Sequence, residues 1–249
     1  MNILVTSGNT LVPIDRVRCL TNVFTGRTGT TIALHCHQRG HRVTLLTSHP
    51  ELVALLHGNE PPQQLWTLEP YRTFTDLRAL LSNVLSSAGF DVLIHCAAVS
   101  DYEAAGVYAP DPHTRFRPED ARWQGSGPHA PALLDRSAGK IKSDEPEIWL
   151  RLVRTPKLID LVRTEWGFRG ILVKFKLEVG VSDEHLLDVA EQARRQSHAD
   201  LMVANTLEEA SSWAFVGPLQ GQYQRVSRDD LAPRLLDAIE LLHKERGGG

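Results

Sequence analysis

Two short segments near the start of the chain carry glycines and small polar residues of the kind that bind anions. Ser7-Gly8-Asn9-Thr10 ends an apolar run, and Thr25-Gly26-Arg27-Thr28-Gly29 opens into a segment with a helical pattern. The first N–H groups of a helix have no partner within the helix, so the second segment offers donors to an anion. Just before it, the Asn22 amide and the Thr25 hydroxyl could bind a phosphate, hold an acyl group or simply cap the helix.

Two later groups of polar residues are also candidates for chemistry. Asp101-Tyr102 follows an apolar run, which is where open parallel sheets bind ligands, although an aspartate there can equally belong to a turn. Lys140-Ile141-Lys142 would direct two ammonium groups to one side of an extended segment. That arrangement suits a polyphosphate, and the alternative is a solvated pair of lysines.

Several common nucleotide-binding and catalytic signatures are absent from the chain. Gly8 is not part of G-x-G-x-x-G, and the apolar run 42–47 ends without the carboxylate that a nicotinamide site uses for the ribose. No P-loop and no G-x-S-x-G elbow occur. His35-Cys36-His37 is not a metal site, because consecutive residues of a helix point to different faces.

The composition of the chain limits the classes of molecule that we expect it to bind. With 249 residues, a net charge of -3 and 42% hydrophobic residues, the chain has neither the basic surface that nucleic-acid binding needs nor a disordered composition. The three cysteines lack the close spacing of a redox or zinc motif, and no apolar run reaches 18 residues. We expect a cytoplasmic protein that binds small molecules, with no nucleic-acid or membrane partner and no bound metal of its own.

The hydrophobic pattern alternates between strands and helices along the chain. Short apolar runs predict buried strands, and leucines at helical spacing predict helices. The expected strands are 3–5, 42–47, 90–98, 148–153, 170–175 and 200–205, and the expected helices are 30–39, 76–88, 156–162, 182–195 and one that begins after Asp229 or Asp230. This order predicts an α/β fold with a doubly wound, mostly parallel, Rossmann-like sheet in one domain, 1–249.

Three segments fall outside that alternation. Residues 106–139 hold five of the 14 prolines and predict a long loop or flap, functional or a spacer. Residues 214–226 predict a polar β-hairpin, and 247–249 a disordered tail.

Six motifs follow one another along the chain: Thr6-Ser7-Gly8-x-Thr10 with Pro13-Ile14-Asp15-x-Val17-Arg18, Asn22-x-x-Thr25-Gly26-x-x-Gly29, Ala97-Ala98-Val99-Ser100-Asp101-Tyr102, Lys140-Ile141-Lys142, Phe175-Lys176-Leu177-Glu178 and Leu201-Met202-Val203-Ala204-Asn205. Taken in this order, they resemble those of phosphopantothenoylcysteine synthetase, a ligase of coenzyme A biosynthesis. The likeness spans nearly the whole chain. The resemblance implies a homodimer in which the carboxylate of 4′-phosphopantothenate reacts with CTP or ATP and Mg²⁺. Cysteine then displaces the nucleotide from the acyl-nucleotide, and no flavin is implied.

The resemblance also implies roles for single residues. Lys140 would assist the activation step and Asn22 would hold the acyl-nucleotide. The nucleotide site would comprise Gly8, Thr10, Ala98, Asp101, Lys140, Lys142 and Phe175. The phosphopantothenate site would comprise Arg18, Asn22, Thr25 and Gly26.

The chain departs from the family pattern at several places. Asn9 stands where a second glycine is usual, so its side chain is expected to intrude on the nucleotide turn. Phe24 replaces a serine, and the segment between Tyr102 and Lys140 is longer than usual. Two alternatives stay open for these reasons: a diverged ligase for another carboxylate, and a nucleotide-binding protein without catalysis.

Overall fold

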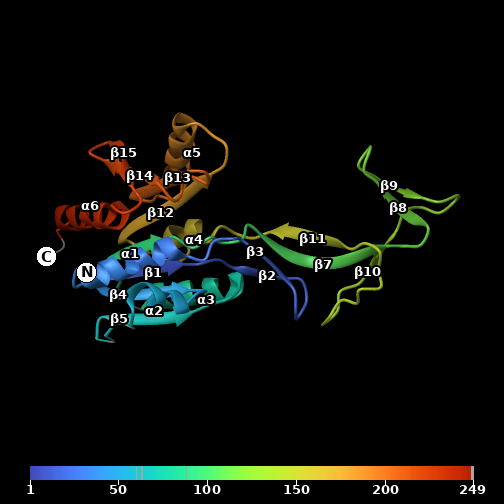
Figure 1. Cartoon of the computed structure of the whole chain (residues 1–249), viewed down its shortest axis with the longest axis horizontal. Coiled ribbons are helices and arrows are strands. Elements are labelled where there is room, and N and C mark those ends of the chain that lie inside the picture. The colour runs from blue at the N-terminus through green and yellow to red at the C-terminus, as the bar shows by residue number, and fades with distance from the viewer. Residues whose placement is uncertain (60, 63, 88, 248–249) are drawn as a thin grey trace. The chain divides into compact units, whose positions relative to one another are not determined.

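The computed structural model describes residues 1–59, 61–62, 64–87 and 89–247 (Figure 1). Contacts divide the chain into two compact units. The larger unit comprises Met1–Thr10, Val23–Val99 and Lys157–Gly249, and the smaller unit comprises Leu11–Asn22 and Ser100–Pro156. This division does not decide whether 1–249 acts as one ligase domain, which stays a prediction.

The larger unit is built on an eight-stranded sheet that is mostly parallel. Its strands, from one edge to the other, are β15 (Gln222–Ser227), β14 (Trp213–Leu219), β13 (Leu201–Thr206), β12 (Ile171–Glu178), β6 (Val92–His95), β1 (Asn2–Ser7), β4 (Arg42–Thr47) and β5 (Trp66–Pro70). Figure 1 shows the β14 and β15 hairpin at one edge and β5 at the other. The doubly wound sheet and the C-terminal hairpin are thus confirmed.

Strand order places the point of topological change beside the first strand. The chain runs outward from β1 through β4 to β5, returns to β6 on the other side of β1, and continues through β12 to β13. In such sheets ligands bind beyond the carboxyl ends of the strands, where the order reverses. The carboxyl ends of β1 and β6 are therefore the expected binding edge.

Helices cover both faces of the sheet. Successive residues of the inner strands point to opposite faces, and they are apolar on each face. Ile3 and Val5 pack beneath one set of helices, and Leu4 and Leu93 beneath the other. The helices of the first face are α1 (Arg27–Gln38), α2 (Glu51–His57) and α6 (Leu231–Glu245), and those of the second are α3 (Phe74–Ser87), α4 (Leu158–Thr164) and α5 (Asp183–Gln196). Among the described residues, the chain has no helix both long and apolar enough to cross a membrane.

The smaller unit consists of short antiparallel strands. Its three-stranded sheet has the order β10 (Leu133–Asp135), β7 (Tyr102–Pro110) and β11 (Trp149–Arg154), and two further pairs are β2 (Leu11–Pro13) with β3 (Cys19–Thr21) and β8 (Thr114–Arg117) with β9 (Arg122–Gly125). The rings of Phe116, Trp123 and Trp149 contact one another with centroids 4.6 to 5.1 Å apart.

Segment 106–139 differs from the expected long loop, since it contains most of β7 and all of β8, β9 and β10. Its prolines explain the difference. Pro110 is the last residue of β7, and the other four prolines lie in the connections between strands. Proline cannot donate to a ladder, so here it marks the ends of short strands and not one unstructured stretch.

Most of the other expected elements are found within a few residues of the predicted bounds. The strand at 42–47 matches β4, and Ser182 caps α5 by accepting a hydrogen bond from the His185 N–H at 3.3 Å. The helix expected at 76–88 is α3, but Ala88 lies outside the described residues, as do residues 248 and 249 of the expected tail. The short strand β5 and helix α2 were not predicted.

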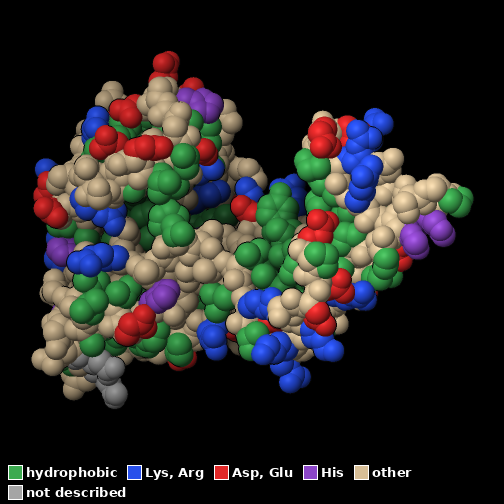
Figure 2. Space-filling model, turned by 45° about the vertical axis from the view of Figure 1, so that its right-hand side comes forward, with side chains coloured by type: hydrophobic (Ala, Val, Ile, Leu, Met, Phe, Trp, Pro, Cys, Tyr) green, Lys and Arg blue, Asp and Glu red, His purple; other side chains and the backbone are tan. Residues whose placement is uncertain are grey.

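The face shown in Figure 2 carries acidic and basic side chains interspersed with one another. This distribution agrees with the small net charge of -3. That no nucleic acid binds stays a prediction.

Leu93→Ala tests the account of the core. Leu93 is fully buried in β6, so the variant should lose about 2–5 kcal/mol of unfolding free energy through lost burial and a cavity. Urea denaturation measures the loss. Leu55→Ala on α2 is the control, because Leu55 is 72% exposed and its truncation should cost below about 0.5 kcal/mol. Equal losses for the two variants would contradict the assignment.

Candidate functional site

In the larger unit, the two glycine turns predicted from sequence lie against each other. A Cβ on Gly26 would lie 2.2 Å from the Gly8 nitrogen, and one on Gly8 would lie 2.1 Å from Ser48 Oγ. Both glycines also have φ near +90°, which other residues rarely adopt. Ser7 Oγ joins the turns by donating a hydrogen bond to the Gly26 carbonyl at 2.6 Å. This contact fixes the start of α1 beside the carboxyl end of β1.

Residues that directly follow β4 and β5 support the first turn from the other side. Ser48 Oγ accepts from the Asn9 N–H at 2.9 Å and donates to Asn9 Oδ1 at 3.0 Å, and the Tyr71 hydroxyl donates to the Ser7 carbonyl at 2.7 Å. Asn9 is only 7% exposed. The side chain expected to intrude on the turn therefore bonds to Ser48.

The β6 end completes this edge of the sheet. The Ala98 N–H donates to the Gly8 carbonyl at 2.8 Å, and the Thr10 N–H donates to the Ala98 carbonyl at 3.3 Å. In β12, Lys174 is in register with His95, and His95 shares a hydrogen bond with Thr6 at 2.9 Å. Phe175 follows Lys174 and thus lies at the same end of the sheet. Gly8, Thr10, Ala98, Gly26 and Phe175 are brought to one edge, and Thr25 is exposed just before α1.

His95 is the buried histidine of this edge, and it is not a proton carrier near neutral pH. Burial, with a smaller effect of Lys174, lowers the pKa of His95 to about 4. Its imidazole is therefore neutral at pH 7, as a buried ring hydrogen-bonded to a threonine hydroxyl should be.

In the smaller unit, the carboxylate of Asp15 joins two segments that the sequence offered as separate candidates. Asp15 Oδ1 accepts from the N–H groups of Val17 and Arg18 at 2.8 Å, and Oδ2 accepts from the Ile141 N–H at 3.1 Å. Arg18 in turn pairs with Asp15 and donates to the Ile141 carbonyl. The Arg16 N–H also donates to the Gly139 carbonyl at 3.0 Å. Arg18 and the lysine segment are thus neighbours.

Buried and exposed residues alternate along the segment Lys140-Ile141-Lys142, as the sequence predicts. Ile141 is 3% exposed, whereas Lys140 and Lys142 on either side of it are exposed. Asn22 and Asp101 are exposed in the same unit, and the Asp101 carbonyl accepts from the Thr155 N–H at 3.0 Å.

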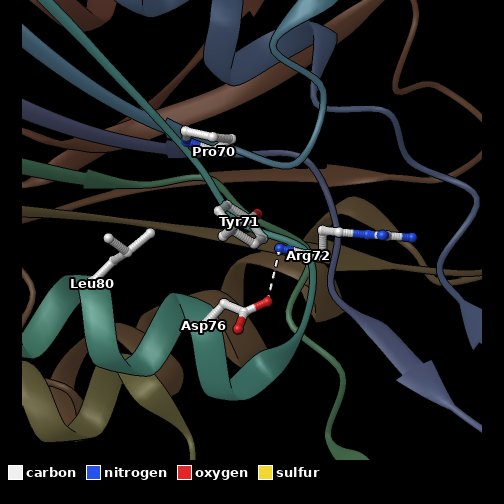
Figure 3. A pocket seen from close by; sticks show the side chains of 5 residues that line it. All are labelled: Pro70, Tyr71, Arg72, Asp76 and Leu80. Atoms are coloured by element: carbon white, nitrogen blue, oxygen red, sulfur yellow. Dashed lines mark hydrogen bonds between the residues drawn. The ribbon is translucent and has the colours of Figure 1, made fainter.

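A cavity of about 460 Å³ opens beside β5 and the start of α3 (Figure 3). Its lining is Pro70, Tyr71, Arg72, Asp76 and Leu80. The Asp76 carboxylate caps the helix, accepting from the N–H groups of Arg72 and Thr73 at 3.2 and 2.8 Å. None of the residues predicted as site residues lines this cavity.

Sequence reasoning missed the supporting residues Ser48, Tyr71 and Asp15. Residues 47–49 lack the carboxylate that a ribose site would use, but a hydroxyl at this position can hydrogen-bond to the neighbouring turn, because the ends of adjacent parallel strands meet. Asp15 lies in a recognised motif, but its partner Ile141 is 126 residues away in sequence. No local pattern reports such a contact.

Protonation of Asp15 should break the hydrogen bonds that link it to Val17 and Ile141, and it should do so at an unusually low pH. Hydrogen bonds from Val17 and then Ile141 lower the pKa of Asp15 from its ordinary value of 3.8. A lowered folded-state pKa means that the stabilisation is present above the unfolded-state value and is lost as pH falls through the folded-state value. In an NMR titration, the amide signals of Val17 and Ile141 should shift together with a midpoint below 3.8, and Asp15→Asn should abolish the shift. A midpoint at or above 3.8 would contradict the link.

The comparisons with known proteins agree with these motifs. A family model described as the DNA/pantothenate metabolism flavoprotein C-terminal domain matches residues 1–110. The chain is 30% identical over 243 residues to the coenzyme A biosynthesis bifunctional protein CoaBC of Thermococcus kodakarensis, covering 96% of this chain and 50% of that protein. It thus spans about half the length of the bifunctional relatives it matches.

Two further relatives match the chain over most of their own length. The human phosphopantothenate–cysteine ligase is 25% identical, with 86% of this chain and 75% of that protein covered. The crystal structure of the DNA/pantothenate metabolism flavoprotein from Streptococcus pneumoniae superposes with a TM-score of 0.75 at 29% identity, covering 98% of this chain and all of that one. With the six motifs and the doubly wound sheet, these matches make the chain similar to the phosphopantothenoylcysteine synthetases over nearly its whole length.

Proposed function

We propose that this protein is a phosphopantothenate–cysteine ligase, which joins the carboxylate of 4′-phosphopantothenate to the amine of cysteine in coenzyme A biosynthesis. The single observation that carries the proposal is the pair of glycine turns, in which Gly26 packs on Gly8 and Ser7 hydrogen-bonds to Gly26 at the carboxyl end of β1. It is supported by the human ligase and the CoaBC proteins, which the chain matches over most of its length.

The reaction would proceed in two displacements. A carboxylate oxygen of the substrate attacks the α-phosphorus of CTP or ATP, and pyrophosphate leaves. The cysteine amine then attacks the acyl carbon, the nucleoside monophosphate leaves with the C–O bond electrons, and the amine loses a proton. An ammonium group stabilises negative charge that builds up on the phosphates, which is the role inferred for Lys140 with Lys142 beside it.

The other roles follow the same resemblance. Gly8, Thr10, Ala98, Asp101 and Phe175 are proposed for the nucleotide. Arg18, Asn22, Thr25 and Gly26 are proposed for the acyl intermediate and phosphopantothenate.

Magnesium would enter with the triphosphate. Within the described part of the chain, no three His, Cys, Asp or Glu side chains form a cluster that could hold a metal ion. Mg²⁺ usually keeps several waters and binds through substrate phosphates and one or two carboxylates, so the residues present fit this mode of binding. A homodimer and a cytoplasmic location are likewise proposed from the family, and no flavin is proposed.

One reaction mixture tests the proposal. Protein, phosphopantothenate, cysteine and Mg²⁺ are mixed with CTP or with ATP, and the products are identified by mass spectrometry. Phosphopantothenoylcysteine with pyrophosphate supports the ligase. Turnover of a different carboxylate would support the diverged ligase instead, and nucleotide binding without pyrophosphate release would support a binding protein.

Lys140→Ala should abolish pyrophosphate release, because it removes the ammonium proposed to act on the triphosphate. A coupled pyrophosphate assay measures the rate. Lys244→Ala is the matched control, since Lys244 is an exposed lysine in the last turn of α6 and should retain the wild-type rate. A near-normal rate for Lys140→Ala would overturn the role given to Lys140.

Asn22→Asp should let the acyl-nucleotide accumulate. Asn22 is proposed to hold the acyl-nucleotide for attack by cysteine, and a carboxylate lacks the N–H donor of the amide, so the variant should slow the second displacement more than the first. Mass spectrometry of an acid-quenched reaction that contains cysteine compares the amount of the intermediate in the variant and in wild type. If neither the wild type nor the variant shows its mass under turnover conditions, the two-displacement scheme is refuted.

A further inference from the structure

Arg228 lies in the larger unit, in the connection between β15 and α6, and it is half-buried. Its Nη2 donates a hydrogen bond to the hydroxyl of Thr28, in the first turn of α1. Its backbone N–H donates to the Ser212 carbonyl at 2.8 Å, which anchors the base of the side chain. Helices α1 and α6 contact each other on the same face of the sheet (Figure 1).

The guanidinium of Arg228 has no anionic partner in the described part of the chain. The titratable groups that act on it are the Cys96 thiol and the Arg27 guanidinium. Burial raises the pKa of the Cys96 thiol to about 12, so Cys96 is uncharged at pH 7. Burial lowers the pKa of Arg228, and Arg27 lowers it further. No described carboxylate neutralises Arg228, whereas half-buried arginines elsewhere, such as Arg163 with Asp200, have a carboxylate.

The position of this guanidinium coincides with the expected binding edge. Cys96 directly follows β6, and its N–H donates to the Thr6 carbonyl of β1 at 3.2 Å. Thr28 is two residues beyond Gly26, whose turn packs on Gly8. Arg228 therefore adds a planar fork of donors beside the first turn of α1. Guanidinium groups bind phosphate oxygens through two parallel hydrogen bonds.

We propose that Arg228 is a substrate-binding residue whose guanidinium binds the phosphomonoester group of the substrate beside the first turn of α1. Thr28 is a positioning residue, because its hydroxyl holds the guanidinium in this orientation. The inference rests on the proposed function for the identity of the substrate. The binding of a phosphomonoester to Arg228 can still be measured without turnover.

Titration calorimetry with 4′-phosphopantothenate and, separately, with pantothenate tests the proposal. Arg228→Gln should weaken binding of 4′-phosphopantothenate about 10- to 100-fold, as expected for the loss of a charged hydrogen-bonding partner. Pantothenate has no phosphate, so its binding should change less than about twofold. Arg228→Lys should restore part of the affinity, and Thr28→Val should cause a smaller loss than Arg228→Gln. Arg234→Gln, an exposed arginine of α6, is the control.

Circular dichroism and thermal melts establish that each variant is folded. If Arg228→Gln fails to fold, Arg228→Lys and Thr28→Val still report on the contact. Wild-type affinity for 4′-phosphopantothenate in folded Arg228 variants would overturn the proposal. So would an effect confined to the KM for the nucleotide.

Turnover separates the inference from the proposed function. If wild type makes phosphopantothenoylcysteine and Arg228→Gln binds 4′-phosphopantothenate normally, only this inference fails. If wild type makes no product, but Arg228→Gln still binds 4′-phosphopantothenate more weakly than wild type does, the inference stands and the ligase assignment fails.

Discussion

The approach of two backbone turns at the carboxyl end of β1 is the constraint on which the candidate site depends. A side chain on Gly26 would clash with Gly8 and one on Gly8 would clash with Ser48, and the Ser7 hydroxyl joins the two turns. This approach fixes where α1 begins, and thus where its unpaired N–H groups lie. Ser48 and Tyr71 hold the first turn from the strands on its other side. The edge is preorganised by hydrogen bonds within the protein.

A carboxylate organises the smaller unit. Asp15 accepts hydrogen bonds from its own turn and from Ile141, so its charge orders Arg18 and the segment of Lys140 and Lys142 together. Because the carboxylate is engaged by N–H groups, it remains ionised well into the acid range. Both lysines are exposed beside a buried isoleucine, which leaves their ammonium groups available to a ligand.

The charged groups at the start of α1 bear on the kind of ligand proposed for this site. The net charge of the chain is -3, yet the first turn of α1 has Arg27 and Arg228 near it and no carboxylate paired with Arg228 in the described residues. A local excess of positive charge at a helix start suits a small phosphorylated molecule. The proposed ligase substrate and its nucleotide are both of that kind.

The sequence by itself determined the fold class, the glycine turns and most of the strands and helices. An apolar run such as 42–47 predicts a buried strand, and a glycine-rich turn before a helical pattern predicts a helix start. Both signals depend only on residues that are neighbours in sequence. The resemblance of six motifs also indicated the family. Local patterns fail where the deciding partner is distant. Ser48 and Asn9, Asp15 and Ile141, and Thr28 and Arg228 meet only after the chain has folded. The short strands of the proline-rich segment 106–139 were likewise not predictable from local sequence. Each strand is stabilised mainly by pairing with another strand, and the intrinsic preference of its own residues contributes little.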